Sequence, residues 1–304
     1  MTDDHSIPPP RVSEEFVQKK AEYFVDVQLW PRETKLDWRG WLSNFKDHEK
    51  DHAIHLLNAF LYYSGELTDE LFKAAFQQLS RRIVPINGPY VAAQAAWRQF
   101  RSDLIVTHVT GEIPNNTDSG YRFAGKARHV LKIDENNIMG SAAVLQRLTD
   151  EGPRPVLFVD DFVGSGDQFV KTWRRDAELL DGSLLSFKRF AGVSGSSFYY
   201  CPLICGSKGC EGIEKECPEV VLSPAHFLSD RYSALSDESI VWPDHLRSSA
   251  YDFLQTASSR AGITDWMGYQ DQALTLAFEH GVPDATLPIY YQDENGWTPL
   301  IKRT

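Results

Sequence analysis

Hydrophobic and polar positions along the chain predict a helical N-terminal region that leads into alternating strands and helices. Between residues 14 and 101 apolar residues recur three or four positions apart, which is the spacing of amphipathic helices. Helices are expected over four segments of this region, the last with Thr68 as its N-cap: Phe16–Val27, Trp38–Phe45, His52–Tyr63 and Leu67–Ile83. Residues 1–13 are polar and proline-rich, so we expect a disordered tail there.

From residue 102 onward, short apolar runs alternate with helical patterns. Strands are expected at Leu104–Val109, from Val156, and at Phe198–Cys205, Glu219–Leu222 and Ala273–Glu279. Helical patterns lie between or beyond them, at Gly125–Lys132, Asn136–Leu148, Gly209–Cys217 and Leu246–Arg260. Such alternation is typical of an α/β fold with a mainly parallel sheet. We therefore divide the chain into a tail (1–13), a helical N-terminal region (14–101) and an α/β domain (102–304).

The stretch Val156–Gln168, VLFVDDFVGSGDQ, carries the clearest chemical signal. Four apolar residues predict a strand buried on both faces, and Asp160 and Asp161 follow where that strand emerges. A glycine-bounded turn then leads into a helix expected over Asp167–Leu180. Open α/β folds bind ligands at the carboxyl ends of their strands, and the N–H groups of a loop and helix N-terminus bind phosphate.

An ordinary strand-to-helix turn is the alternative, because Asp, Gly and Ser are common turn residues. Two consecutive carboxylates directly after a buried strand favour the binding site, since packing alone gives them no reason to be there.

These residues resemble the phosphoribosyl pyrophosphate (PRPP) motif of type I phosphoribosyltransferases: four hydrophobics, two acids, two hydrophobics and a small-residue loop. The resemblance implies that Asp160 and Asp161 are the catalytic pair, receiving the ribose hydroxyls and favouring an oxocarbenium-like transition state. It implies that the 5′-phosphate is held by Gly164, Ser165, Gly166, Asp167 and Gln168. Mg²⁺ is the cofactor expected with PRPP, where it would neutralise the pyrophosphate; no protein residue is assigned as a metal ligand.

Two positions of this loop depart from the family pattern. The family has Gly or Lys where Asp167 stands, and Thr or Ser where Gln168 stands. A carboxylate beside a dianionic phosphate is unfavourable, so we expect Asp167 to turn away and cap the following helix.

The chain as a whole resembles the phosphoribosyltransferase-like proteins of bacterial conflict systems. The resemblance spans roughly residues 36–303 and rests on VDDFVGSGDQ and on the C-terminal FEHGVPDATLPIYY…GWTPLIKR. It implies a type I phosphoribosyltransferase-like sheet with a helical N-terminal extension, and a role as an effector in antiviral defence.

A second candidate phosphate site follows the first strand of the α/β part. In phosphoribosyltransferases the loop after that strand binds pyrophosphate, so the resemblance assigns this role to Arg122 and Lys126, with Arg128 nearby. Arg122 and Lys126 stand four positions apart and share a helix face. A solvated helix start is the other interpretation.

Two further groups of residues could carry chemistry, as a zinc site or as a general base. The intervals between Cys201, Cys205, Cys210 and Cys217 fit structural zinc poorly, so zinc is not expected. His280 could act as a general base with Asp284, but a structural turn fixed by Pro283 is the favoured interpretation.

Composition narrows the possible partners. The net charge of −11 disfavours sequence-independent nucleic-acid binding and anionic membranes. The chain has no apolar run of membrane-spanning length and no signal-peptide pattern, so we expect a cytoplasmic protein. Aromatic residues are dense between residues 16 and 76, where helical spacing favours packing in a core or against a protein partner.

The leading functional prediction is binding of a phosphorylated ribose, PRPP with Mg²⁺, with transfer or cleavage of the pentosyl group at C1. If the protein is an enzyme, it is then a pentosyltransferase. One alternative is a non-catalytic nucleotide- or PRPP-sensing module that acts through a protein partner. The other makes Asp160, Asp161 and Asp167 a metal-binding cluster for phosphoester hydrolysis.

Overall fold

The computed structural model of this protein describes residues 12–85, 87–111, 119–192 and 195–303. They form two compact units: one joins the chain up to Gly65 with Asp230–Thr304, and the other spans Glu66–Ser229. Most of the expected disordered tail lies outside the described residues. Of its last two residues, Ser13 caps the first helix, with its hydroxyl accepting the Phe16 N–H at 3.2 Å. The domain division at residues 101 and 102 stays a prediction.

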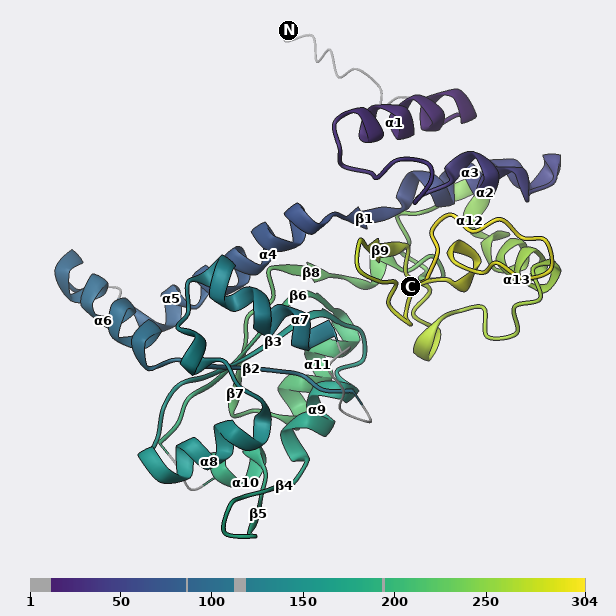
Figure 1. Cartoon of the computed structure of the whole chain (residues 1–304). Coiled ribbons are helices and arrows are strands. Elements are labelled where there is room, and N and C mark those ends of the chain that lie inside the picture. Colours follow the sequence, from purple (N-terminus) through teal and green to yellow (C-terminus); the bar gives the residue numbers. More distant parts are fainter. Residues whose placement is uncertain (1–11, 86, 112–118, 193–194, 304) are drawn as a thin grey trace, which may run out of the picture. The chain divides into compact units, whose positions relative to one another are not determined.

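The Glu66–Ser229 unit is built around one parallel sheet (Figure 1). Its strands are β2 (Ile105–His108), β3 (Val156–Val163), β6 (Phe198–Gly206), β7 (Val220–Leu222) and β8 (His226–Leu228). The order is β2-β3-β6-β7, with β8 pairing further along β6, and every pair is parallel. The predicted α/β class with a mainly parallel sheet is confirmed.

Helices cover both faces of this sheet, which explains why its central strands β3 and β6 are buried along nearly their whole length. On one face the sheet shares a core with α8 (Ser141–Glu151), α9 (Asp167–Arg174), α10 (Phe187–Ala191) and α11 (Ser207–Glu216). The other face is covered by α4 (Gly65–Gln78), α6 (Tyr90–Asp103) and α7 (Ser119–Lys126). There Phe100 of α6 meets Tyr199 edge-on at 5.4 Å, and the Cys201 thiol donates to the Ala75 carbonyl of α4. Figure 1 shows α7 on one side of β2 and β3, with α8 and α9 on the other.

The second unit is assembled from both ends of the chain. It contains α1 (Glu14–Asp26), α2 (Trp38–Ser43), α3 (Lys50–Ala59), β1 (Leu61–Tyr63), α12 (Asp244–Arg247), α13 (Ala250–Arg260) and β9 (Leu276–Phe278). β1 and β9 pair in parallel, with Leu61 opposite Leu276.

The C-terminal segment that begins with FEHGVPDATLPIYY is part of this core. Trp41 stacks on Tyr290 at 5.4 Å, and the indole N–H groups of Trp41 and Trp297 both donate to the Ile289 carbonyl. The Asp37 N–H donates to the Leu300 carbonyl at 2.8 Å. Trp38, Trp41 and Phe45 are fully buried or nearly so, so the aromatic side chains of this N-terminal segment pack internally.

Shorter elements complete both units. They are α5 (Ser80–Ile83), the hairpin β4 (Ala177–Glu178) and β5 (Leu184–Leu185), the π-helical turn η2 (Ala127–Leu131), and the 3₁₀ turns η1 (Asp47–Glu49), η3 (Glu135–Asn137), η4 (Asp230–Tyr232), η5 (Tyr269–Asp271) and η6 (Pro288–Tyr290). No helix of the described residues has the length and apolar character needed to cross a bilayer.

Four expected boundaries are corrected. The helix expected over His52–Tyr63 ends at Ala59, because Leu61–Tyr63 pairs with β9 instead. Thr68 lies inside α4 and is buried, so it is no N-cap. The helix expected over Asp167–Leu180 ends at Arg174, and residues from Ala177 enter a hairpin.

The fourth correction concerns the acidic pair: β3 continues to Val163, so Asp160 and Asp161 lie within the strand, not beyond it. Their pairing continues because Asp160 lies opposite Pro202 and Phe162 opposite Ile204 of the long neighbour β6.

Candidate functional site

Asp160 and Asp161 lie in the carboxyl-terminal half of β3, the central strand between β2 and β6. They are only 3% and 9% exposed. Each carboxylate accepts the backbone N–H of the next residue, Asp160 from Asp161 at 3.0 Å and Asp161 from Phe162 at 2.8 Å. Successive strand residues point to opposite faces, so the two carboxylates flank the strand end.

Tyr200 of β6 holds the Asp160 carboxylate in place. Its hydroxyl donates to Asp160 Oδ2 at 3.0 Å, and its ring stacks on Phe169 of α9 at 4.1 Å. Sequence reasoning missed Tyr200, although the alternation of the two buried strands puts it on the same sheet face as Asp160. The hydroxyl of a buried tyrosine needs a hydrogen-bond acceptor, so a tyrosine in the predicted buried strand could have indicated an acceptor such as Asp160.

Burial raises the pKa of Asp160 well above its usual range, and the neighbouring Asp161 charge and hydrogen bond add to this; the bond from Tyr200 acts in the opposite direction. Burial together with the Asp160 charge also raises the pKa of Tyr200, which therefore remains a neutral donor. The pair can thus hold a proton at the strand end, and it attracts hydroxyl donors there.

The loop Gly164-Ser165-Gly166 connects β3 to α9. Gly166 is the N-cap of α9 with φ +84°, a conformation that favours glycine. Asp167 is therefore the first residue of the helix and not its cap, which corrects our expectation. Its N–H donates to the Ser165 hydroxyl at 3.2 Å. Ser165 and Asp167 are half-buried and Gln168 is exposed, so the predicted phosphate loop is accessible at the start of α9.

Two glycines of α11 fix the shape of this loop. A Cβ on Gly209 would lie 2.9 Å from the Gly164 carbonyl oxygen and 2.6 Å from a Val163 methyl, and one on Gly212 would lie 2.9 Å from the Ser165 carbonyl oxygen. The backbone of the helix therefore packs directly against the loop, which no larger residue would allow. Sequence reasoning missed this support because these glycines stand more than forty positions from the loop.

The segment after β2 reaches the same end of the sheet. The Thr110 N–H donates to Thr172 of α9 at 3.1 Å, and Arg175 donates to the carbonyl of Gly111 at 2.9 Å. Gly120 at the start of α7 packs on the Val159 carbonyl, where a Cβ would lie 3.2 Å away. Residues 112–118 of the expected pyrophosphate loop lie outside the described residues.

The two expected pyrophosphate-binding cations differ in their surroundings. Arg122 is exposed on the first turns of α7. Lys126, at the end of α7, forms an ion pair with Asp69 and lies over the Phe123 ring at 5.4 Å. Their assignment to pyrophosphate binding stays a prediction.

Of the remaining candidates, Cys205 lies opposite Val163 at the end of β3, and Cys210 lies in α11 beside the loop. Cys205 and Cys210 bring their sulfurs within 2.7 Å, and within the described part of the chain no group of three or more His, Cys, Asp or Glu side chains could hold a metal ion. His280 belongs to the other unit, where Asp284 forms an ion pair with Arg303.

Sequence comparison agrees with the fold. The family PRTase-CE matches residues 38–303, most of the chain. This chain belongs to the PRTase-CE family, which indicates a phosphoribosyltransferase-like function. No curated protein matches it significantly.

Proposed function

We propose that this protein binds PRPP with Mg²⁺ at the carboxyl end of β3 and transfers or cleaves its pentosyl group at C1. One observation carries the proposal: two buried carboxylates lie in the carboxyl-terminal half of the central parallel strand, and a glycine-bounded loop leads from the end of that strand into a helix N-terminus. This order of groups provides acceptors for ribose hydroxyls next to N–H donors for a phosphate.

In the proposed complex, Asp160 and Asp161 receive the ribose hydroxyls. Gly164, Ser165 and Gly166, with the first turn of α9, hold the 5′-phosphate. Mg²⁺ would be carried by the pyrophosphate oxygens, where it neutralises the leaving group. During reaction the C1–O bond to pyrophosphate breaks and its electron pair leaves with pyrophosphate. An acceptor atom, or water in a cleavage reaction, forms the new bond to C1 and loses a proton to solvent.

Two features support the alternative of a non-catalytic PRPP- or nucleotide-sensing module. Asp167 places a carboxyl group in the phosphate loop, and the raised pKa of Asp160 favours its neutral form, which stabilises developing positive charge less well. A role as an effector in a bacterial defence system is compatible with either chemistry, since an effector can act by turnover or by ligand-controlled contact with a partner protein.

Calorimetry with PRPP, with and without Mg²⁺, tests the binding step. We expect Mg²⁺-dependent binding by the wild type and at least about a tenfold loss in Asp160→Asn/Asp161→Asn, because each substitution replaces a carboxyl group by an amide with one oxygen acceptor fewer for the ribose hydroxyls. Asp150→Asn is the control, since Asp150 is exposed on α8, where its carboxylate accepts a hydrogen bond from Gln146. Equal binding by the double variant would contradict the proposal.

Release of pyrophosphate separates the two functions. Release that depends on Asp160 and Asp161 supports pentosyl transfer or cleavage. Binding without release across a panel of acceptors, water included, supports the sensing module.

A further inference from the structure

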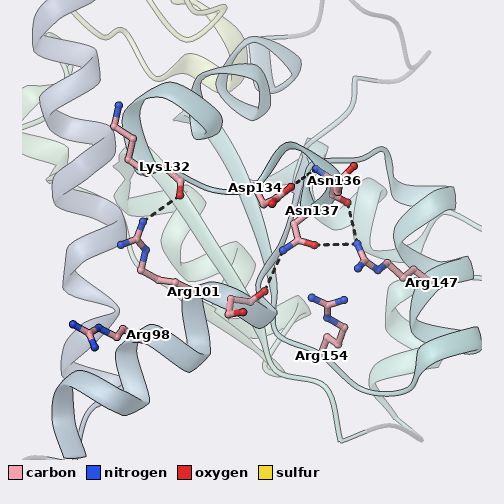
Figure 2. Close-up of a pocket in the computed structure, with 9 residues that line it drawn as sticks. Arg98, Arg101, Lys132, Asp134, Asn136, Asn137, Arg147 and Arg154 are labelled. Carbon is pink, nitrogen blue, oxygen red and sulfur yellow. Dashed lines mark hydrogen bonds between the residues drawn. The ribbon is translucent and has the colours of Figure 1, made fainter. Parts of the chain in front are cut away.

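A second, unassigned pocket lies at the opposite edge of the same sheet. It has a volume of about 500 Å³ and is formed by the end of α6, the segment after η2, α8 and the residues before β3 (Figure 2). Arg154 on its wall precedes Asp160 by six positions of nearly extended chain, or about 20 Å. The pocket is therefore distinct from the proposed PRPP site.

The lining of this pocket is strongly cationic in a protein whose net charge is −11. Five of its side chains carry positive charge, Arg98, Arg101, Lys132, Arg147 and Arg154, and Asp134 is its one acidic lining residue. In Figure 2, Arg98, Arg101 and Lys132 lie on one side of the pocket, and Arg147 and Arg154 lie on the other.

Most of this charge is left uncompensated by neighbouring groups. Arg147 and Arg154 share Glu151, with N–O distances of 3.0 Å each. Arg101 donates only to the carbonyls of Leu131 and Lys132, and its buried Nε has no partner among the described residues. The Arg98 guanidinium and the Lys132 ammonium form no ion pair within the described part of the chain.

The pocket is also built with fixed geometry. Asn137 is buried, donates to the Ser102 carbonyl at 3.2 Å and accepts from Arg147 at 3.0 Å, so it connects α6 to α8. Lys132 adopts φ +57°, uncommon for a residue with a side chain, and this turn presents its carbonyl to Arg101. Three of the cations, Arg101, Arg147 and Arg154, are thus held by hydrogen bonds, whereas Arg98 and Lys132 are exposed at the rim. Held cations bind an anion with less loss of side-chain freedom than mobile ones do.

We propose that this pocket binds a small molecule that carries two or more phosphate groups, of the size of a nucleoside triphosphate. Guanidinium groups on two walls suit several phosphate oxygens, because each presents its donors in a planar fork. A volume of about 500 Å³ is that of a drug-sized ligand site and exceeds the needs of a single phosphate. The acidic molecule around it disfavours a nucleic-acid backbone, which needs an extended basic stripe.

Calorimetry of the full chain with ATP and, separately, with inorganic tripolyphosphate tests the proposal. Arg98→Gln/Lys132→Gln removes two charges without disturbing any ion pair, and we expect it to weaken ATP binding by about tenfold or more. The matched control is Arg81→Gln/Arg82→Gln, which removes two exposed cations from α5 and should bind ATP as the wild type does.

The remaining outcomes distinguish the ligands and the two sites. Tighter binding of ATP than of tripolyphosphate identifies a nucleotide, and equal binding identifies the phosphate chain as the recognised part; either supports the proposal. Loss of ATP binding in Asp160→Asn/Asp161→Asn, with Arg98→Gln/Lys132→Gln unaffected, would overturn it by placing the nucleotide at β3. No binding of either probe at millimolar concentration, or much tighter binding of an RNA oligonucleotide through the same two cations, would also overturn it.

Discussion

At the scale of single residues, Asp160 combines a ligand-binding position with an unfavourable environment. Its carboxylate is almost fully buried beside that of Asp161, and one tyrosine hydroxyl is its side-chain donor from β6. Groups with perturbed pKa values cluster at functional sites because binding and catalysis need them there despite their cost in stability. Removing the charge of such a residue should therefore increase the stability of the folded protein.

We therefore predict that Asp160→Asn stabilises the ligand-free protein at neutral pH. The raised pKa means that the folded state holds the proton more tightly than the unfolded state, so wild-type stability falls as pH rises above the ordinary Asp pKa. Asparagine carries no charge and keeps an oxygen acceptor for Tyr200, while its amide nitrogen faces the Asp161 N–H. The relief of charge burial should exceed the loss of that local hydrogen bond. The gain should be about 1 kcal/mol or more at pH 7 and vanish below about pH 4. Thermal unfolding of both proteins at the two pH values measures it, and a variant less stable at pH 7 would contradict it.

The four cysteines should differ in reactivity. Burial raises the pKa of Cys201 and raises that of Cys217 to about 12. The contact between Cys205 and Cys210 raises the pKa of Cys205, to which burial adds, and lowers the pKa of the half-exposed Cys210. Thiolates react and thiols do not. Limited treatment with iodoacetamide followed by peptide mass spectrometry should find Cys210 modified first, and Cys210→Ser should remove the fast phase. Prior labelling of Cys217 would disprove this order.

At the scale of elements, the candidate site depends on the contact between α11 and the loop after β3. Neither element alone specifies the loop conformation, because the loop carbonyls of Gly164 and Ser165 are in contact with Gly209 and Gly212 of the helix. A side chain at Gly209 or Gly212 would therefore have to displace the backbone of the loop.

Gly209→Ala should therefore weaken PRPP binding while leaving both carboxylates in place. The added Cβ would lie 2.6 Å from Val163 and 2.9 Å from the Gly164 carbonyl oxygen, so the loop must shift. We expect a destabilisation of about 1–3 kcal/mol together with a clear loss of PRPP affinity. Gly192→Ala is the control, since a Cβ there meets nothing nearer than 3.6 Å. Unchanged affinity in Gly209→Ala would show that the loop tolerates the shift.

At the scale of the whole molecule, the two ends of the chain fold together into one unit. Trp41 near the N-terminus packs on Tyr290, and both Trp41 and Trp297 donate to Ile289. The C-terminal residues on which the sequence resemblance partly rests thus have a structural role as the other half of this core.

A chain that ends at Thr286 should consequently lose the fold of residues 12–59. It lacks the partners of Trp41 and the strand-like contact between Leu36 and Ile301. Rapid proteolysis within residues 12–59 and a red shift of tryptophan fluorescence would report this. A chain that ends at Lys302 keeps these contacts and serves as the control; equal protease resistance of the two would contradict the prediction.

The sequence by itself determined the parallel sheet, the acidic pair and the loop that follows, because these depend on periodicity and on neighbours within about thirteen residues. It also indicated the family, since the motif is contiguous. Only the tertiary structure decided the extent of β3, which continues because β6 is long enough to pair with it.

Only the tertiary structure shows that Tyr200 contacts Asp160 and that α11 packs on the loop. It also shows that five cations between residues 98 and 154 line one pocket. The physical reason is the same in each case. Local patterns follow from the geometry of a helix or strand, whereas side chains far apart in sequence meet only through the packing of whole elements, which no short pattern encodes.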